Sequence, residues 1–464
     1  MLPRGARFLI AAALATPAIN AQARGGRAAP GMIRGTVIDH YSSRPSVDRL
    51  VVVGKAKATT DIDGRFAIPA PAGPYDITVV DRNRSAVTFF RGLRRRDPVL
   101  LHYGDPNLVP NGYETHAAHI DGTLSGGGYD PKTSNMATVY FSSPQVVRDK
   151  TLGGPTYGAS STGFGPLDLT WIGPASITGT LIAVRTTREK PGDPTPASRD
   201  KGPVVWWEAH KDVKVSSGEV TTADLAFTRL PMGHIGARIE FDPGMVALGR
   251  GVTYFHARNR GIPLDGDGRE TREPLFDYPV PDLRHLPGRY CVNVYDGTRG
   301  HFSSTSKCGI ALGATDVTIR VHAPPKLTSP AFKQYSHDRV TISRDTRFAW
   351  TALDGPVVYR LTLKGSPRIN VYTTATSTAW PDLQSVGISF PAIKEGYGVS
   401  VTAFGPHAGM DEAFSPTGIA TPFPSEMFSS QSLEPYVEVV APGEPAVIPP
   451  AKQVDDDDEA PPRR

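Results

Sequence analysis

The sequence predicts an all-β protein made of several tandem antiparallel β-sandwiches, followed by a disordered tail. Apolar and polar residues alternate in short segments, which is typical of strands with one buried face. Gly 47 and Pro 44 together make up about a fifth of the chain without a collagen-like period, so turns are frequent. Long helical patterns are nearly absent. At 464 residues, and with one domain per ~100–150 residues, three to five domains are expected.

The first 23 residues have the composition of a signal peptide. Arg4 and Arg7 form a basic start, 8–15 is an apolar run, and Ala21-Gln22-Ala23 is a small-residue cleavage site. The apolar run is too short to span a bilayer, and no later stretch is typical of a transmembrane helix. We therefore expect an exported protein without a transmembrane segment, located in the periplasm, at the cell surface or outside the cell.

The segment 32–103 has the pattern of one small sandwich. A tight turn is expected at 60–66, where Gly64 supplies a permissive backbone. Tyr75, Ile77 and Val79 share one face of a later strand, because side chains alternate along a strand. The expected strands include 33–37, 50–53, 75–79 and 99–101.

Three motifs in this segment carry a family resemblance: IRGTV at 33–37, TDIDGRFAI at 60–68 and AGPYDITVV at 72–80. They resemble the carboxypeptidase regulatory-like family, whose domains have a transthyretin-like β-sandwich. The resemblance implies an accessory module without an active site of its own. Such domains are also similar to starch-binding-type sandwiches, which implies carbohydrate as one class of ligand.

Two short marks recur along the chain and predict further copies of this sandwich. An opening strand of the form Ile-x-Gly occurs at Ile33, Ile120, Ile177 and, more weakly, Ile235. A closing strand that begins with Asp occurs at Asp97, Asp168, Asp224 and Asp316. The order of openers and closers predicts four related sandwiches, of which the second and third are degenerate. Their predicted bounds are 32–103, 117–172, 175–230 and 233–322.

After a linker at 322–325 the pattern changes. Over 326–421 an early Trp350 and a late Tyr397 lie in alternating strands. This arrangement resembles a fibronectin type III domain, in which two such aromatic residues pack between the sheets, and immunoglobulin-like sandwiches share it. The segment 422–464 is rich in Pro, Ser, Glu and Asp, so we expect a mostly disordered acidic tail in which only 436–440 has a strand pattern.

The charge balance argues against a dedicated nucleic-acid-binding protein. The net charge is +4, and it falls to +2 when the two signal-peptide arginines are removed. Basic residues nonetheless cluster in the first domain, near Phe89, Phe90 and Tyr103. The cluster either forms a solvated rim or contacts an anionic polysaccharide, and its candidate ligand contacts are Arg94, Arg95 and Arg96.

Cys291 and Cys308 are the only cysteines, and export would place them in an oxidising compartment. In the repeat alignment Cys291 takes the position of Asp76, and Cys308 lies just before a closing strand. We therefore predict a disulfide between Cys291 and Cys308 that connects adjacent strands, with two free thiols as the alternative.

Metal and cofactor sites are not expected. His116 and His119 have the nearest approach to a metal-ligand spacing, but on a strand their rings need not converge. Asp61 and Asp63, like the acidic run at 265–270, lack the terminal bidentate Glu of a calcium loop. Capping of turns explains these aspartates better.

Catalysis has little support either. The chain has no Gly-x-Ser-x-Gly elbow and no phosphate-binding loop, so it is predicted not to be an enzyme. Binding is the sharper hypothesis. In 204–209 adjacent side chains alternate, so at most one of Trp206 and Trp207 faces the core. Glu208 shares a face with Trp206, which favours Trp206 as the ring exposed on its own sandwich. Such a ring could bind a sugar or a partner, but a contact between domains is the favoured interpretation.

These observations together predict an exported, non-catalytic multidomain protein with an adhesion, scaffold or envelope-interaction role. The expected partner is a polysaccharide or another envelope protein. The alternative is a carbohydrate-binding protein of the starch-binding-like type.

Overall fold

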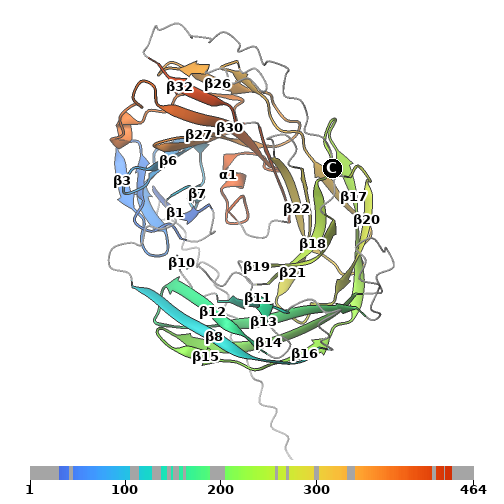
Figure 1. The fold of residues 1–464 in the computed structure, drawn as a ribbon. Coiled ribbons are helices and arrows are strands. Elements are labelled where there is room, and N and C mark those ends of the chain that lie inside the picture. The colour runs from blue at the N-terminus through green and yellow to red at the C-terminus, as the bar shows by residue number, and fades with distance from the viewer. Residues whose placement is uncertain are drawn as a thin grey trace, which may run out of the picture.

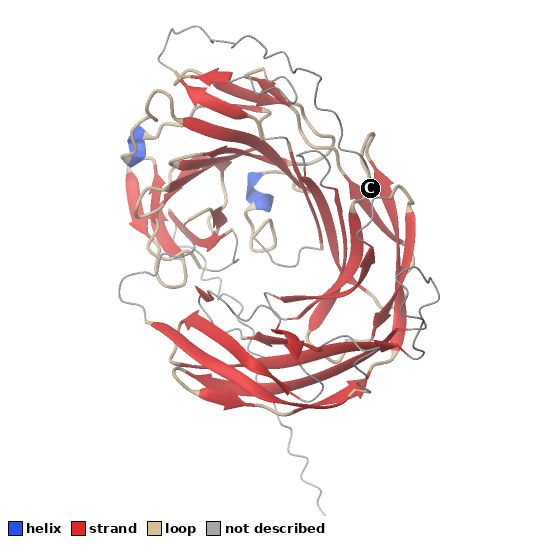
Figure 2. Ribbon diagram, viewed as in Figure 1, coloured by secondary structure: helices blue, strands red, loops and turns tan. Residues whose placement is uncertain are grey.

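The structure is a computed structural model of the chain. The residues that it describes are 31–40, 45–104, 114–127, 137–143, 148–149, 156–159, 163–188, 204–256, 260–267, 271–296, 302–331, 340–420, 425–432 and 434–440. The predicted signal peptide and the part of the predicted tail from 441 onward lie outside them. Strands dominate the described residues, as predicted, and helix is confined to the single-turn α1 (Met410–Ala413) and a 3-10 turn at Gln384–Val386 (Figure 2).

Within the described residues, the first sandwich consists of the seven strands β1–β7. A sheet of order β4-β1-β7 lies against the strands β3-β2-β5-β6, and β1 runs parallel to β7. Alternate residues of β1 such as Ile33 and Val37 are fully buried, which is the expected consequence of their spacing. The strands are β1 (Met32–Asp39), β2 (Leu50–Val53), β3 (Ala56–Thr59), β4 (Arg65–Pro69), β5 (Tyr75–Val80), β6 (Ala86–Leu93) and β7 (Val99–His102).

The second sandwich differs from the prediction. The segments 117–172 and 175–230 do not form two units, because they share one apolar core that runs from Ala118 to Phe227. Strands β12-β8-β16 form one side and β11-β9-β13-β14 the other, and β16 also pairs with β14. The strands are β8 (Thr115–Gly126), β9 (Ala137–Ser142), β10 (Arg148–Asp149), β11 (Thr156–Ala159), β12 (Gly163–Ile172), β13 (Ser176–Arg188), β14 (Val204–Ser216), β15 (Val220–Thr222) and β16 (Leu225–Arg229).

The third sandwich repeats the same order of strands, with β20-β17-β23 on one side and β19-β18-β21-β22 on the other. Its first and last strands are again parallel. The chain therefore holds three copies of this arrangement within the described residues, instead of the four predicted. The strands are β17 (Met232–Phe241), β18 (Gly249–His256), β19 (Arg260–Asp267), β20 (Leu275–Pro281), β21 (Gly288–Asp296), β22 (Phe302–Ile310) and β23 (Val317–Val321).

The predicted number of repeated sandwiches was wrong because one predicted opening strand and one predicted closing strand are in fact inner strands of the second sandwich. Ile177 belongs to β13, which takes the place of β5 in the first sandwich, and Asp168 belongs to β12, which takes the place of β4. An Ile-x-Gly triplet suits any strand that passes close to another backbone, so it does not identify an opening strand.

The C-terminal sandwich packs β24-β26-β29 against β28-β27-β30 and β32. Trp350 and Tyr397 are buried in the same core, as predicted, together with Trp380. The strands are β24 (Leu327–Ser329), β25 (Val340–Ile342), β26 (Arg347–Trp350), β27 (Val358–Lys364), β28 (Arg368–Thr373), β29 (Ser377–Ala379), β30 (Gly396–Gly405), β31 (Glu426–Gln431) and β32 (Tyr436–Val439).

The beginning of the predicted tail is structured. Strand β32 coincides with the predicted strand pattern at 436–440, but β31 was not predicted. Its sequence, EMFSSQ, buries Phe428 and is otherwise mostly polar, so its hydropathy pattern is weak. The strand forms because β22 pairs with it on one side and β30 on the other. Both of its hydrogen-bonding edges are thereby satisfied by segments distant in the chain.

One sheet of 14 strands passes through three of the four sandwiches. Strand β6 of the first sandwich pairs in parallel with β28 of the C-terminal sandwich, and β31 connects that sandwich to β22 of the third. The first and C-terminal sandwiches also share apolar cores, since Tyr372 and Phe414 pack with Phe90.

The sandwiches are therefore not arranged in chain order. Around the open ring seen in Figure 1 the blue first sandwich is followed by the orange-red C-terminal sandwich, the yellow third and the cyan-green second. The first and second sandwiches, which are neighbours in sequence, lie at the two ends of this series. Neither described helix has the length or apolar content needed to cross a bilayer.

Candidate functional site

Trp206 is buried, so its candidate role as an exposed ligand contact is wrong. The residue is 7% exposed and belongs to an apolar cluster that joins the second and third sandwiches. Its neighbours in this cluster include Ile182 and Val184 from the second sandwich and Ile235 from the third. Alternation correctly placed Trp206 and Trp207 on opposite faces, but β14 is covered on both. The favoured interpretation, a contact between domains, describes the Trp206 ring.

Of the three arginines proposed as ligand contacts, Arg94 and Arg95 bond to the C-terminal sandwich, whereas Arg96 contacts the first sandwich. The backbone N–H groups of Arg94 and Arg95 donate to Asp411 Oδ1 of α1 at 2.8 and 2.9 Å. The Arg95 guanidinium also donates to the Asp411 carbonyl. The Arg96 guanidinium lies 5.9 Å from the centroid of the Tyr75 ring. This segment therefore connects two sandwiches, and of the three residues Arg94 is the one classed as exposed.

The predicted disulfide between Cys291 and Cys308 is present, and it joins directly opposite residues of β21 and β22. The equivalent strands of the first sandwich carry an ion pair there, with Arg91 Nη1 2.6 Å from Asp76 Oδ2. Both pairs lie beside a β-bulge, and the next residue has a positive φ in each case, 74° at Gly92 and 79° at Gly309. The first and third sandwiches therefore share this β-bulge as well as their strand order. The disulfide of the third sandwich takes the position of the ion pair in the first.

Removing the disulfide is expected to lower the free energy of unfolding by about 3 kcal/mol, because its closed loop of 17 residues no longer restricts the unfolded chain. The variant Cys291→Ala/Cys308→Ala tests this in denaturant titrations. Asp76→Ala/Arg91→Ala is the matched control, and loss of that partly exposed ion pair is expected to cost no more than about 1 kcal/mol. Equal losses in the two variants would contradict the prediction.

His116 and His119 do not converge, and Asp61 caps a turn; residues 268–270 of the acidic run lie outside the described residues. His116 is buried, with Nε2 3.1 Å from the Gly173 carbonyl, whereas His119 points to solvent and pairs with Asp168. Asp61 Oδ1 accepts the backbone N–H groups of Asp63 and Arg65, which is the capping role predicted for it.

A different cluster, Glu208, His210 and His285, brings three metal-ligand side chains together. His210 Nδ1 lies 2.9 Å from Glu208 Oε1, and His285 Nε2 lies 3.1 Å from Glu208 Oε2. One ligand atom from each residue lies within 4.8 Å of the others. Glu208 is 3% exposed, while both histidines are exposed. Sequence reasoning missed this cluster. The alternation of β14 puts Glu208 and His210 on one face, but His285 is 77 positions away from Glu208.

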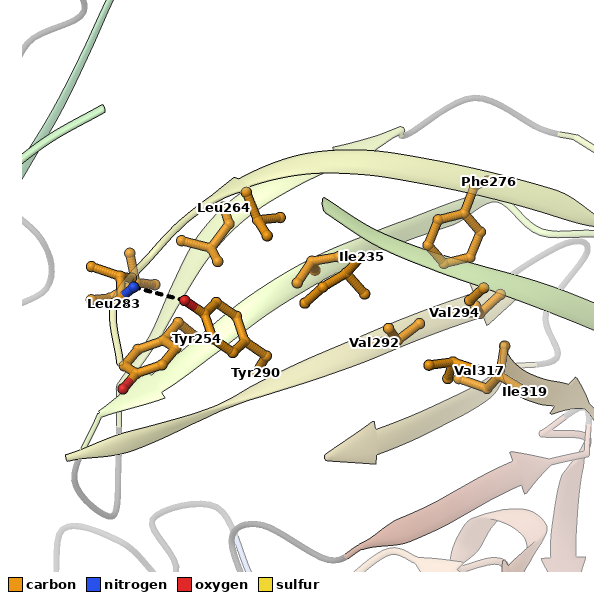
Figure 3. Packing of buried hydrophobic residues seen from close by; sticks show 14 of the residues in the cluster. Ile235, Tyr254, Leu264, Phe276, Leu283, Tyr290, Val292, Val294, Val317 and Ile319 are labelled. Carbon is orange, nitrogen blue, oxygen red and sulfur yellow. Dashed lines mark hydrogen bonds between the residues drawn. The ribbon is translucent and has the colours of Figure 1, made fainter. Parts of the chain in front are cut away.

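Two tyrosines form hydrogen bonds with the backbone of the loop that carries His285. The Leu283 N–H donates to the Tyr290 hydroxyl at 2.7 Å, as Figure 3 shows, and the Tyr254 hydroxyl donates to the Leu286 carbonyl at 2.6 Å. Burial raises the pKa of both tyrosines, so the hydroxyls stay protonated. Leu283 and Leu286, which flank His285 on either side, are themselves buried. The position of His285 is thus fixed by the core of the third sandwich.

A buried polar cluster also lies inside the first sandwich. Asp81 Oδ1 is 2.9 Å from Arg49 Nε and 3.0 Å from His102 Nε2. His102 Nδ1 is in turn 2.9 Å from Thr88 Oγ1. Burial alone would raise the pKa of Asp81, but the hydrogen bond and charge of His102 and the charge of Arg49 lower it below its usual value. The cluster connects β2, β5, β6 and β7 and has a structural role.

A second histidine cluster lies where the first sandwich meets the C-terminal one. His40 Nε2 is hydrogen-bonded to the Tyr103 hydroxyl at 2.6 Å, and the two rings stack. The guanidinium groups of Arg360 and Arg368 lie 4.7 and 4.4 Å from the Tyr103 ring centroid. Burial, together with these two positive charges, lowers the pKa of His40 to about 2. The His40 imidazole is therefore neutral in the folded protein at ordinary pH.

Stability is expected to fall as the pH decreases below about 6.5, the ordinary pKa of histidine. In this range the unfolded chain takes up a proton at His40 and the folded protein does not, so the free energy of unfolding falls by up to ~1.4 kcal/mol per pH unit. His40→Phe keeps an aromatic ring and should give a shallower dependence in denaturant titrations. His119→Phe is the exposed control. An unchanged slope in His40→Phe would contradict the assignment, since the lowered pKa values of His322 and His407 account only for the remainder.

Neither a family model nor a curated protein matches the chain in sequence. A Bacteroides ovatus protein described as a cell adhesion protein aligns at 10% identity and TM-score 0.15, covering 45% of this chain and 93% of that one. A streptococcal ancillary pilin aligns at 11% identity and TM-score 0.16, covering 63% and 99%. The Bacillus anthracis TIE protein aligns at 10% identity and TM-score 0.13, covering 63% and 51%. TM-scores this low do not establish a shared overall fold.

Proposed function

We propose that this chain is an exported, non-catalytic β-sandwich protein that serves as a rigid adhesion or scaffold protein of the cell envelope. The observation that supports this most directly is the sheet of 14 strands that crosses three sandwiches. Flexible linkers usually leave tandem domains free to move. Here, backbone pairing and shared cores give the surface loops of different sandwiches fixed relative positions, which suits a protein that presents a large surface.

The polar clusters of the described residues support the same proposal. The Asp81 cluster connects strands of one sandwich, and the His40 cluster lies between two sandwiches. Arg94 and Arg95, which were candidates for ligand binding, bond to α1 of the neighbouring sandwich. These groups stabilise the assembly of sandwiches, which leaves the exposed loops and strand edges to contact a polysaccharide or an envelope protein.

We further propose that the three repeated sandwiches are carboxypeptidase regulatory-like domains of transthyretin-like fold, and that the C-terminal sandwich is fibronectin type III-like. The threefold repetition of one strand order supports the first assignment. The burial of Trp350 and Tyr397 between two sheets supports the second.

Binding to isolated envelopes tests the proposal. The purified mature chain is expected to show saturable retention on envelopes from cells that lack it, and no turnover of a panel of glycan, peptide and ester substrates. An unrelated exported β-sandwich protein of similar net charge is the control for adsorption. Retention no greater than that of the control, or turnover of any substrate, would contradict the proposal.

A further inference from the structure

We propose that Glu208, His210 and His285 bind a divalent transition-metal ion of the zinc class where the second and third sandwiches meet. Glu208 and His210 lie on β14 of the second sandwich, and His285 lies in the loop between β20 and β21 of the third. The inference goes beyond the envelope role proposed above and does not depend on it.

The three side chains are the ligand types that zinc selects. Imidazole nitrogen and carboxylate oxygen both bind Zn²⁺, and sites with two histidines and one glutamate leave the fourth tetrahedral position to water or another ligand. At zinc–ligand bond lengths of ~2.0–2.1 Å, tetrahedral ligand atoms lie about 3.3 Å apart. The observed distances are 2.9 Å from His210 Nδ1 to Glu208 Oε1 and 3.1 Å from His285 Nε2 to Glu208 Oε2, and one ligand atom from each of the three residues lies within 4.8 Å of the others. Small rotations of the two exposed imidazoles would bring all three ligand atoms around one ion.

The burial of Glu208 supplies an independent reason for a cation. A carboxylate removed from water needs compensating partners. Within the described residues, its side-chain partners are the imidazoles of His210 and His285. A divalent ion placed between the three groups would supply positive charge to this buried carboxylate.

The ligands are also held in place before any ion binds. Glu208 pairs with Val184 and His210 with Ile182 in the long β13–β14 ladder. His285 is positioned by the tyrosine-bonded loop described above. Because the ligands come from two rigid elements, an ion would lose little affinity to ordering of the protein.

The position of the cluster suggests what the ion does. Trp206 lies on the same face of β14 as Glu208 and His210, and its ring packs within the apolar contact between the two sandwiches. From Trp206 to His210 this face therefore passes from the buried contact to the surface. An ion at its outer end would connect the second sandwich to the third and stabilise their contact.

Zinc titration of the chelator-treated, full mature chain tests the inference. Calorimetry is expected to show one Zn²⁺ ion bound per chain, and the ion should raise the melting temperature. His210→Ala and His285→Ala each remove a ligand, so each should weaken binding by at least ~100-fold, the upper end of the losses seen when an outer-shell partner is removed. Co²⁺ should give the intense visible absorption of a four-coordinate site, and His285→Ala should abolish it.

His234→Ala is the matched control, because His234 is an exposed histidine paired with a single carboxylate, Asp277. It should bind zinc like the parent protein. In the presence of chelator, His285→Ala should melt at the temperature of the parent, which separates loss of the ion from loss of folding. Absence of stoichiometric binding, or affinity that His285→Ala leaves unchanged, would overturn the inference and leave only a hydrogen-bonded cluster.

Discussion

Replacing Trp206 with alanine is expected to lower the free energy of unfolding by about 3–5 kcal/mol. The indole is buried between two sandwiches, so its removal leaves a cavity that both would have to close. The loss should appear in the denaturant transitions of the second and third sandwiches, because the ring contributes to the contact between them. Tryptophan fluorescence and circular dichroism measured on the same titration would follow it.

Two controls make this prediction specific. Trp206→Phe keeps an aromatic ring in the contact and should cost much less than the alanine variant. Val220→Ala changes a side chain that is 61% exposed on β15 of the same sandwich and should stay within about 0.5 kcal/mol of the parent. A loss below ~1 kcal/mol in Trp206→Ala would mean that the ring does not lie in the core between the sandwiches.

Replacing Asp81 with alanine is expected to cost about 3–5 kcal/mol. The change leaves the buried Arg49 guanidinium without the carboxylate that lies 2.9 Å from it. Asp63→Ala removes an exposed carboxylate that pairs with Arg65, and it should cost no more than about 1 kcal/mol. Denaturant titrations at pH 7 compare the two. Similar losses would show that the Asp81 cluster is no more important than a surface ion pair.

The pH dependence of the Asp81 variant provides a second test. The pKa of Asp81 is lower in the folded protein than in the unfolded chain, where it is ~3.9. The carboxylate therefore stabilises the fold fully above that value, and the stabilisation disappears as the pH falls through the lower, folded pKa. Asp81→Ala should accordingly have a flatter acid limb than the parent below about pH 4. An unchanged acid limb would contradict the lowered pKa.

Local sequence patterns predicted those parts of the fold that depend only on contacts within one sandwich. The strands of the first sandwich follow from alternation and turn residues. The disulfide follows from aligning Cys291 with Asp76 across the repeat, and the two strand pairs are indeed equivalent. The sequence wrongly predicts two sandwiches in place of the second one, because the Ile-x-Gly triplet at Ile177 has the pattern of an opening strand although it lies in β13.

Features that depend on contacts between sandwiches could not be predicted from local pattern. Alternation shows which residues share a face with Trp206, but it does not show that another sandwich covers that face. Strand β31 has a weak pattern because its stability comes from β22 and β30. The Glu208 cluster was missed for a similar reason, since His285 reaches it from a loop of the next sandwich.

The pairing of β31 with two sandwiches has a consequence for the order of folding. Until residues 426–431 have been synthesised, β22 and β30 each lack a neighbour, and β6 lacks one until β28 follows it. Such open edges are templates for pairing with other chains. Contacts this distant in sequence also form slowly. The nascent protein therefore carries unpaired edges in at least two sandwiches until its late segments arrive, which makes delayed folding or chaperone protection during synthesis valuable to this chain.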